Sequence, residues 1–271
     1  MQVIRPRHLA TVVAETESRP EMLRIPFSTY CRKTEWGVTQ TGIAYTTLDI
    51  SIAGMRNIKR ANPWERTVPV LHVGGRIIPG SHRILAWADA HRLPGAPPLF
   101  PAENDKEVRE WETWTDEHLG PLLRREVYRV LHKEVRHYGK GPWSTFKLWL
   151  IKPGFRIAAR HYRATTYDAD DRAATHAALE RTVGRLRESG TGYLFTKHPT
   201  AADHATAAFW EPVVRIAGPL GMDGDDGWGE LVQYVRTVKP QRTTRVGGRK
   251  ARGKDWDRLE AAVTATSSLS P

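Results

Sequence analysis

Three side chains in one short polar segment have types and spacing suited to thiol chemistry. Ser28 and Tyr30 supply hydroxyl groups, and Cys31, the single cysteine of the chain, supplies a thiol. Ser28 stands where a C-x-x-C motif would have its first cysteine. Because this segment has only one thiol, it cannot support a dithiol–disulfide cycle. A thiol in the first turn of a helix, beside Arg32 and Lys33, could have a lowered pKa and form a mixed disulfide. The alternative is that Cys31 is a small buried residue that packs under a sheet.

A second candidate site lies at the start of a helix predicted over residues 81–90. Gly80 and Ser81 follow two apolar runs that flank Gly74-Gly75, which is a β-hairpin signal. The hydroxyl of Ser81 and the first free N–H groups of the helix suit a carboxylate. Ser81 is equally a plain N-cap, a role that needs no ligand, and the two roles are compatible.

The elements that must position these residues alternate along the first third of the chain. Apolar periodicity, β-branched runs and turn residues predict the order strand, helix, strand, short helix, hairpin, helix. The expected ranges are residues 22–25, 31–41, 43–50, 51–60, 67–78 and 81–90. Ser28 or Thr29 is the expected N-cap of the first helix.

A proline-rich connector at residues 94–101 marks a domain boundary, because its prolines exclude both a helix interior and a central strand. The chain beyond it is helical in pattern. Helices are expected at residues 104–119, 121–135, 168–189, 199–217 and 228–238. Thr200 and Asp203 have the spacing of a capping box that starts a core helix. We therefore expect an N-terminal extension (1–20), a mixed domain (21–93), the linker, an all-helical domain (102–238) and a flexible basic tail (239–271).

The net charge of +11 is concentrated in two segments. Residues 124–163 carry a net charge of +9 and residues 236–258 a net charge of +7 on an otherwise mildly acidic chain. Such segments favour anions, namely an acidic small molecule, a nucleic acid or an acidic protein, although a solvated cationic surface is an equal interpretation.

The sequence does not support a membrane protein, a secreted protein or a metal-binding protein. No apolar run is long enough to span a membrane or to form a secretory signal, so we expect a cytoplasmic protein. We expect no metal site, because the histidines lack ligand spacing and are interpreted as surface or structural residues: His132, His137, His198 and His204.

An ordered set of motifs resembles the cytosolic glutathione transferases. The resemblance covers roughly residues 21–235. Its motifs are residues 25–33, Asn62-Pro63, Val68-Pro69-Val70-Leu71, Ile78-Pro79-Gly80-Ser81, Ile84-Leu85, the acidic-aromatic helix 111–120 with Pro121, Tyr193-Leu194-Phe195 and residues 200–203. The fold that this resemblance implies is an α+β N-terminal thioredoxin-like domain followed by an all-α C-terminal domain.

The resemblance also implies a thiol site. Ser28 would donate a hydrogen bond to the sulfur of bound glutathione or another low-molecular-weight thiol, with Cys31 and Tyr30 as alternatives. Val68-Pro69 would be a cis peptide that turns the Val68 backbone toward the ligand; the alternative is a trans proline in an edge strand. Ser81 would hold the γ-glutamyl carboxylate. Gly80 stands where the family usually has Glu, Gln or Asp, which removes one polar contact.

The implied function is a transferase whose bound thiolate attacks an electrophilic small molecule, in a homodimer. Two alternatives stay open. Within the family, the same thiolate could serve an isomerase or a dehalogenase. Outside catalysis, the chain could be a binding module that uses its basic segments for nucleic acid or an acidic protein.

Overall fold

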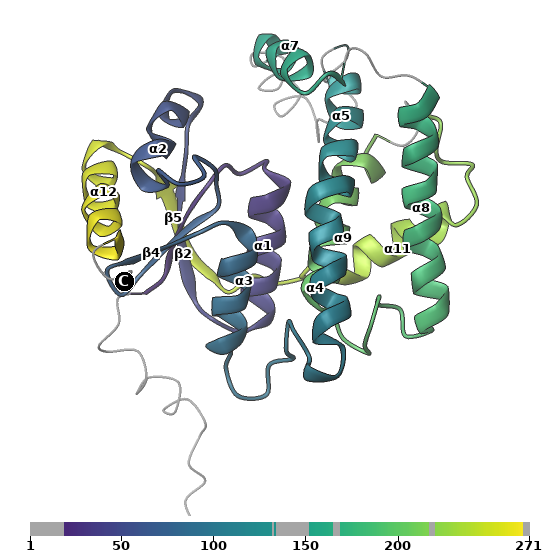
Figure 1. Cartoon of the computed structure of the whole chain (residues 1–271), viewed down its shortest axis with the longest axis horizontal. Coiled ribbons are helices and arrows are strands. Elements are labelled where there is room, and N and C mark those ends of the chain that lie inside the picture. Colours follow the sequence, from purple (N-terminus) through teal and green to yellow (C-terminus); the bar gives the residue numbers. More distant parts are fainter. Residues whose placement is uncertain (1–18, 132, 134–151, 165–168, 217–219, 268–271) are drawn as a thin grey trace, which may run out of the picture. The chain divides into compact units, whose positions relative to one another are not determined.

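The computed structural model describes residues 19–131, 133, 152–164, 169–216 and 220–267 (Figure 1). The chain divides into two compact units. Unit 1 combines the chain up to Ala96 with the chain from Arg242 onward, and unit 2 runs from Pro97 to Gln241. The predicted N-terminal extension lies outside the described residues except for its last two.

Unit 1 is built on a five-stranded mixed sheet with the strand order β4-β3-β1-β2-β5. The strands are β1 (Glu21–Arg24), β2 (Tyr45–Asp49), β3 (Val70–Val73), β4 (Arg76–Pro79) and β5 (Arg245–Lys250). β1 runs parallel to β2 and antiparallel to β3. β3 and β4 form the predicted hairpin around Gly74 and Gly75, whose φ angles of +56° and +74° suit a tight turn.

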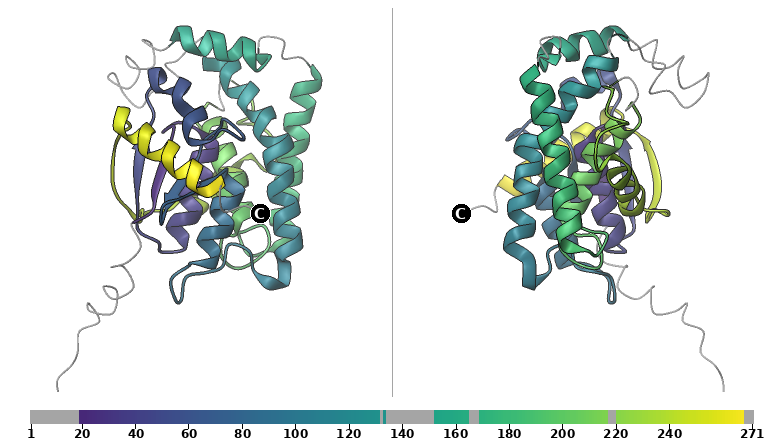
Figure 2. Two further views of the ribbon diagram at one scale, coloured as in Figure 1. Left: turned by 60° about the vertical axis from the view of Figure 1, so that its left-hand side comes forward. Right: turned by 90° about the vertical axis from the view of Figure 1, so that its right-hand side faces the viewer.

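Helices cover both faces of this sheet (Figures 1 and 2). α1 (Thr29–Gln40) and α3 (Ser81–Ala90) pack against each other on one face. On the opposite face, α2 (Ile58–Ala61), which follows a 3₁₀ segment at Ile52–Asn57, packs against α12 (Gly253–Ser267). The predicted alternation of strands and helices in the first third of the chain is confirmed.

The core under α12 joins the front of the chain to its C-terminal part. Trp256, Leu259, Ala262 and Val263 recur at helical spacing and are buried. They pack on an apolar cluster of the sheet and α2 formed by Leu23, Leu48, Ile50, Ile58, Ala61, Val70 and Ile77. α12 starts just after one outer strand, β5, and near its end Thr266 Oγ1 accepts a hydrogen bond from Ile77 N of the other outer strand at 3.1 Å. The helix therefore spans the whole width of the sheet.

The prediction of a flexible tail over residues 239–271 is wrong for most of that range. β5 pairs in parallel with β2, and α12 buries an apolar face. Charged residues add further attachment, since Arg60 of α2 lies 2.7 Å from Asp257 and 2.6 Å from Glu260. The dense basic and polar composition concealed both the strand and the apolar stripe of the helix. Residues 268–271 lie outside the described part.

Two adjacent glycines allow β5 to dock on β2, and they make different contacts. A Cβ on Gly248 would lie 2.3 Å from Thr47 Oγ1, a distance that atoms do not tolerate. A Cβ on Gly247 would lie 3.9 Å from Thr46, which is an ordinary contact. Of these two glycines, only Gly248 lies too close to a β2 residue to accept a side chain.

Unit 2 is helical. Its helices are α4 (Asp105–Trp114), α5 (Gly120–Leu131), α7 (Lys152–His161), α8 (Ala169–Ser189), α9 (Ala201–Val214) and α11 (Trp228–Val238). A π-helical segment, Thr115–Leu119, joins α4 to α5, and a 3₁₀ turn, Ala102–Asn104, precedes α4. The part of the predicted helix 121–135 beyond residue 133 lies outside the described residues.

α9 forms the centre of unit 2, and its start is fixed by the predicted capping box. Asp203 is buried and accepts hydrogen bonds from Thr200 N at 2.8 Å and from Leu194 N at 2.8 Å. Tyr234 of α11 adds its hydroxyl at 3.1 Å. Burial raises the pKa of Asp203 while these donors act in the opposite direction. The capping box therefore ties three segments of unit 2 together.

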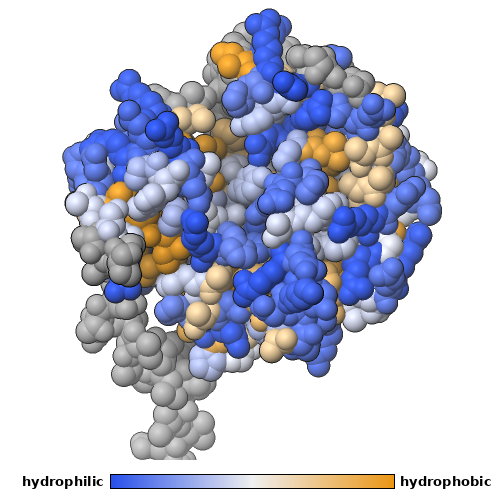
Figure 3. All heavy atoms as spheres, viewed as in Figure 1, coloured by the Kyte–Doolittle hydropathy of each residue, from blue (hydrophilic) through white to orange (hydrophobic). Residues whose placement is uncertain are grey.

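The face shown in Figure 3 is largely hydrophilic, with scattered apolar patches. Across the part of the chain that the structure describes, no helix is both long and apolar enough to cross a membrane.

The glycine pair in β5 provides a matched test of the fold. Replacing Gly248 with Ala should lower the free energy of unfolding by about 1–3 kcal/mol, because the new methyl group overlaps Thr47. Gly247→Ala should change it by less than about 0.5 kcal/mol. Urea unfolding of both variants measures the difference. Equal effects would contradict the close pairing of β5 with β2.

The acid limb of stability should depend on Asp255. Hydrogen bonds from Arg249 are the main cause that lowers the pKa of Asp255 to about 2, and Arg252 N adds a bond at 2.8 Å. Because the folded pKa lies below the unfolded one, this stabilisation is present above pH ~4 and is lost as the pH falls through about 2. It amounts to about 1–2 kcal/mol.

Asp255→Asn should therefore remove that amount near neutral pH and flatten the loss of stability between pH ~5 and ~2. Asp257→Asn is the matched control, since Asp257 is exposed and also pairs with an arginine. The free energy of unfolding measured against pH is the readout. An unchanged slope in Asp255→Asn would refute the assignment.

Candidate functional site

Strand register brings the predicted site segments to one end of the sheet of unit 1. Leu23 of β1 lies opposite Val70 of β3, and Val70 lies opposite Pro79 of β4. The end of β1, the start of β3 and the end of β4 are therefore neighbours. The segment with Ser28 follows the first, Val68-Pro69 precedes the second, and Gly80-Ser81 follows the third. A hydrogen bond from Gly80 N to Pro69 O at 3.0 Å closes this end.

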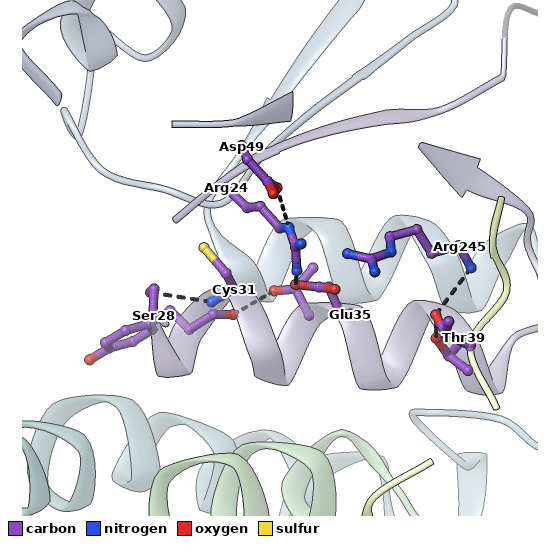
Figure 4. Close-up of polar contacts among 10 residues, drawn as sticks. Arg24, Ser28, Cys31, Glu35, Thr39, Asp49 and Arg245 are labelled. Carbon is purple, nitrogen blue, oxygen red and sulfur yellow. Dashed lines mark hydrogen bonds and ion pairs between the residues drawn. The ribbon is translucent and has the colours of Figure 1, made fainter. Parts of the chain in front are cut away.

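Ser28 is the N-cap of α1 (Figure 4). Its backbone is extended, with φ −70° and ψ 127°, and its Oγ accepts a hydrogen bond from Cys31 N at 3.4 Å. Because the oxygen is the acceptor in this bond, the hydroxyl can still donate its proton to another group. The side chain is half-buried, and Tyr30, in the first turn of the same helix, is half-buried as well. Ser28 thus combines a capping role with a capacity to donate.

Cys31 does not have the properties of a reactive thiol. It is a free thiol that is 1% exposed, so the interpretation as a buried residue is confirmed. Burial raises the pKa of its thiol to about 12, and hydrogen bonds with Ser28 and the Ile25 backbone offset this only in part. At neutral pH the thiol is protonated, which is the unreactive form. The predicted alternative of a lowered pKa beside Arg32 and Lys33 is wrong.

An ion-paired network that the sequence analysis did not single out fixes the approach to Ser28. Arg24, at the end of β1, donates to Asp49 Oδ1 of β2 at 2.7 Å and to Glu35 Oε1 of α1 at 2.5 Å (Figure 4). Burial alone would lower the pKa of Arg24, but hydrogen bonds and charges from the two carboxylates outweigh it, so the pKa is raised. The sequence did contain a signal for this network, because Arg24 is a charged residue within the otherwise apolar run 22–25.

Residues 62–69 form the second wall of the site. Val68-Pro69 is a cis peptide, as the resemblance implied. Buried Asn62 organises the preceding turn, because its Nδ2 donates to Thr67 O at 3.1 Å and its Oδ1 accepts from Glu65 N at 3.1 Å. Asn62 therefore holds the chain that leads into the cis peptide, a role that the sequence analysis did not assign.

The start of α3 forms the third wall, and here the N-cap prediction is wrong. Gly80 is the N-cap, with φ +81°, and Ser81 is the first helical residue. A positive φ carries the chain from β4 into the helix, a conformation that favours glycine. Gly80 offers no side-chain cap, so the first N–H groups of α3 keep their capacity to bind an anion.

Glu65 was also missed, and it lies against Gly80. A Cβ on Gly80 would stand 3.1 Å from Glu65 Oε2. Glu65 Oε1 accepts from Arg83 Nη1 at 2.6 Å. A carboxylate and a guanidinium thus flank the N-terminus of α3.

The remaining predictions concern the histidines. His204 is buried in α9, and burial lowers its pKa to about 3, in keeping with a structural role. His132 and His137 lie outside the described residues. Within the described ranges, no group of three or more His, Cys, Asp or Glu residues could hold a metal ion.

With this geometry established, the relatives of the chain can be compared with it. Residues 27–91 match the family model for the glutathione S-transferase N-terminal domain. A tau class glutathione S-transferase from mango, Mangifera indica, is 13% identical with a TM-score of 0.57, covering 93% of this chain and 99% of that one. No curated protein matches.

Two bacterial structures extend the comparison. The beta-etherase of Sphingobium sp. strain SYK-6 is 14% identical with a TM-score of 0.62, covering 93% of this chain and 100% of that one. A theta class glutathione S-transferase from Xanthomonas axonopodis pv. citri, solved with glutathione bound, is 17% identical with a TM-score of 0.55, covering 83% and 95%.

The family model identifies residues 27–91 as a glutathione S-transferase N-terminal domain, and the solved structures show that the chain has the fold of the glutathione S-transferases. The predicted resemblance is confirmed, and so is the predicted fold of an α+β N-terminal domain followed by an all-α domain.

The burial of Cys31 generates a chemical prediction. With a thiol pKa of about 12, the native protein should react with Ellman's reagent on the order of 10³-fold more slowly near pH 8 than the urea-unfolded protein does. Stopped-flow absorbance measures both rates. Fast modification of the native protein would contradict the buried, protonated thiol.

Proposed function

We propose that this chain is a glutathione transferase-type enzyme that binds a low-molecular-weight thiol, glutathione or an analogue, and uses its thiolate to attack an electrophilic small molecule. The observation that carries this proposal is the convergence of Ser28, the Val68-Pro69 peptide and Ser81 at one end of one sheet. Each group offers a different contact to an extended thiol: a hydroxyl, a backbone edge and a helix N-terminus.

Ser28 would lower the pKa of the bound thiol. A hydrogen bond donated by its hydroxyl would favour a sulfur anion, and the N-terminus of α1 adds positive potential at the same place. The thiol proton leaves to solvent, and the thiolate then forms a bond with the electrophilic carbon as the leaving group departs. Conjugation, isomerisation and dehalogenation would all begin with the formation of this bound thiolate.

Backbone and helix groups would orient the rest of the ligand. The Val68 backbone beside the cis peptide would pair with it like an added strand. Ser81 and the open N–H groups of α3 would receive its carboxylate. Positioning of this kind raises the effective concentration of the thiolate against its cosubstrate. A homodimer, as the resemblance implies, and a cytoplasmic location complete the proposal.

A second candidate, a module that binds nucleic acid or an acidic protein, has one observation in its favour. Along β5 and its flanks, the described residues include five exposed cations without an ion pair in the described structure: Arg242, Arg245, Lys250, Arg252 and Lys254. The other basic segment supports it less, since Arg125 pairs with Asp171 and Arg129 with Glu126. Salt-dependent retention on a nucleic-acid column, without retention on immobilised glutathione, would favour this candidate.

Ser28→Ala tests the proposed enzyme. Loss of the hydroxyl should raise the pKa of the bound thiol by about one unit and reduce kcat/KM for conjugation about 10–100-fold. Absorbance of the thiolate near 240 nm and steady-state rates against pH are the readouts.

Controls separate catalysis from capping. Ser51→Ala removes another N-cap serine of unit 1, whose Oγ accepts from Gly54 N at 3.2 Å, and should cost about 0.5–2 kcal/mol of stability without affecting the thiol pKa. Ser28→Thr should retain turnover. Unchanged turnover in Ser28→Ala together with a loss in Tyr30→Phe would move the role to Tyr30.

A further inference from the structure

β5 is the outermost strand on its side of the sheet of unit 1 (Figure 2). Ala251 N, just after the strand, donates to Asp49 O of β2 at 3.0 Å. Because the backbone groups of alternate residues point to the same side of a strand, Arg249 also faces β2, whereas Gly248 and Lys250 face outward. Among the described residues, no group forms a hydrogen bond with these outward N–H and C=O groups. Each of the two residues therefore offers one donor and one acceptor to another extended chain.

The opposite edge of the sheet differs. There, Ile77 N of β4 donates to Thr266 Oγ1 of α12 at 3.1 Å, so the helix covers part of that edge. The residues of β5 are exposed, apart from half-buried Gly247. An open edge strand is a template for pairing with another chain, and its side chains decide which chain can pair.

The charges along β5 favour an acidic partner. Four exposed cations that form no ion pair within the described ranges lie on β5 or shortly after it: Arg245, Lys250, Arg252 and Lys254. Asp49, which lies opposite Lys250 in the sheet, already accepts a hydrogen bond from Arg24. Asp255, which follows Lys254, already accepts from Arg249. The four cations thus remain able to pair with carboxylates of another chain.

The same features disfavour two other occupants of this edge. A second copy of β5 would bring arginine and lysine side chains against like charges, which destabilises a pair of strands. A nucleic acid could use the cations, but it would leave the outward backbone groups of Gly248 and Lys250 without strand partners. An extended acidic peptide satisfies both the charges and the backbone.

We propose that the open edge of β5 binds an extended acidic peptide of another protein, which adds a strand to the sheet of unit 1. The backbone groups supply the pairing, and the cations select the sign of the charge. Val246, which is 55% exposed, adds an apolar contact. The glycines at 247 and 248 have no side chain that would obstruct the incoming strand. This interaction goes beyond the proposed thiol chemistry and does not depend on it.

Fluorescence anisotropy of the full chain with labelled decapeptides tests the proposal. The probe alternates glutamate with threonine. One matched peptide has lysine in place of glutamate, and the other keeps the glutamates but has N-methyl groups on its backbone nitrogens. The wild type should bind the probe at least about tenfold more tightly than either matched peptide, because one lacks the negative charge and the other lacks the N–H donors. Hydrogen exchange should slow at residues 245–251 when the probe binds.

Charge reversal locates the site. Arg245→Glu combined with Lys250→Glu should weaken binding of the probe more than about tenfold. Lys59→Glu combined with Arg76→Glu is the matched control, since it reverses two exposed cations elsewhere in unit 1 and should leave the affinity unchanged. Thermal unfolding would show that both double variants fold, and the comparison of peptides on the wild type needs no variant.

Four results would overturn the proposal. The wild type could fail to bind the probe, or it could bind the N-methylated peptide equally well, which would exclude strand addition. Tighter binding of oligothymidylate than of the probe would assign the surface to nucleic acid. Self-association that the double reversal in β5 abolishes would assign the edge to a second copy of the chain. Each of these results would leave the proposed thiol chemistry standing, because Ser28→Ala tests that function separately.

Discussion

The antiparallel pairing of β1, β3 and β4 is the constraint on which the site depends. Two residue pairs, Leu23 with Val70 and Val70 with Pro79, set which loops meet. A slip of one residue would turn the buried side chains of β3 outward and also move the cis peptide away from the end of β1. The buried cluster under α12 makes that slip costly, since Leu23 and Val70 both belong to it. The same apolar packing that stabilises unit 1 therefore aligns its polar groups.

Local signals in the sequence predicted well the strands and helices that flank the three candidate site segments. Strand and helix periodicity placed β1 to β4 and α3 closely, and the capping box at Thr200 and Asp203 was recognised from spacing alone. These features depend on residues close together in the chain. The buried state of Cys31 was predicted as one of two alternatives, and only the packed structure distinguishes them.

What the sequence did not reveal depends on contacts between distant residues. Arg24 meets Glu35 and Asp49 only when β1, β2 and α1 assemble. Glu65 reaches Gly80 across the sheet end, so the apparent loss of a polar residue at position 80 could not be judged locally. The segment after residue 239 was misjudged because charge dominates its composition, while the partners of its apolar stripe lie about two hundred positions earlier.

The return of the chain to its first unit has a consequence for biosynthesis. The ribosome makes β1 to β4 early, but it makes β5 and α12 only after all of unit 2. Until those last residues leave the exit tunnel, the apolar face bearing Leu23, Leu48 and Ile77 lacks its cover and is open to chaperones or to aggregation. The sheet of unit 1 therefore cannot be completed until all of unit 2 has been synthesised. A product truncated before β5 would contain the sequence of unit 2 but would lack one strand of the sheet and the helix that covers it.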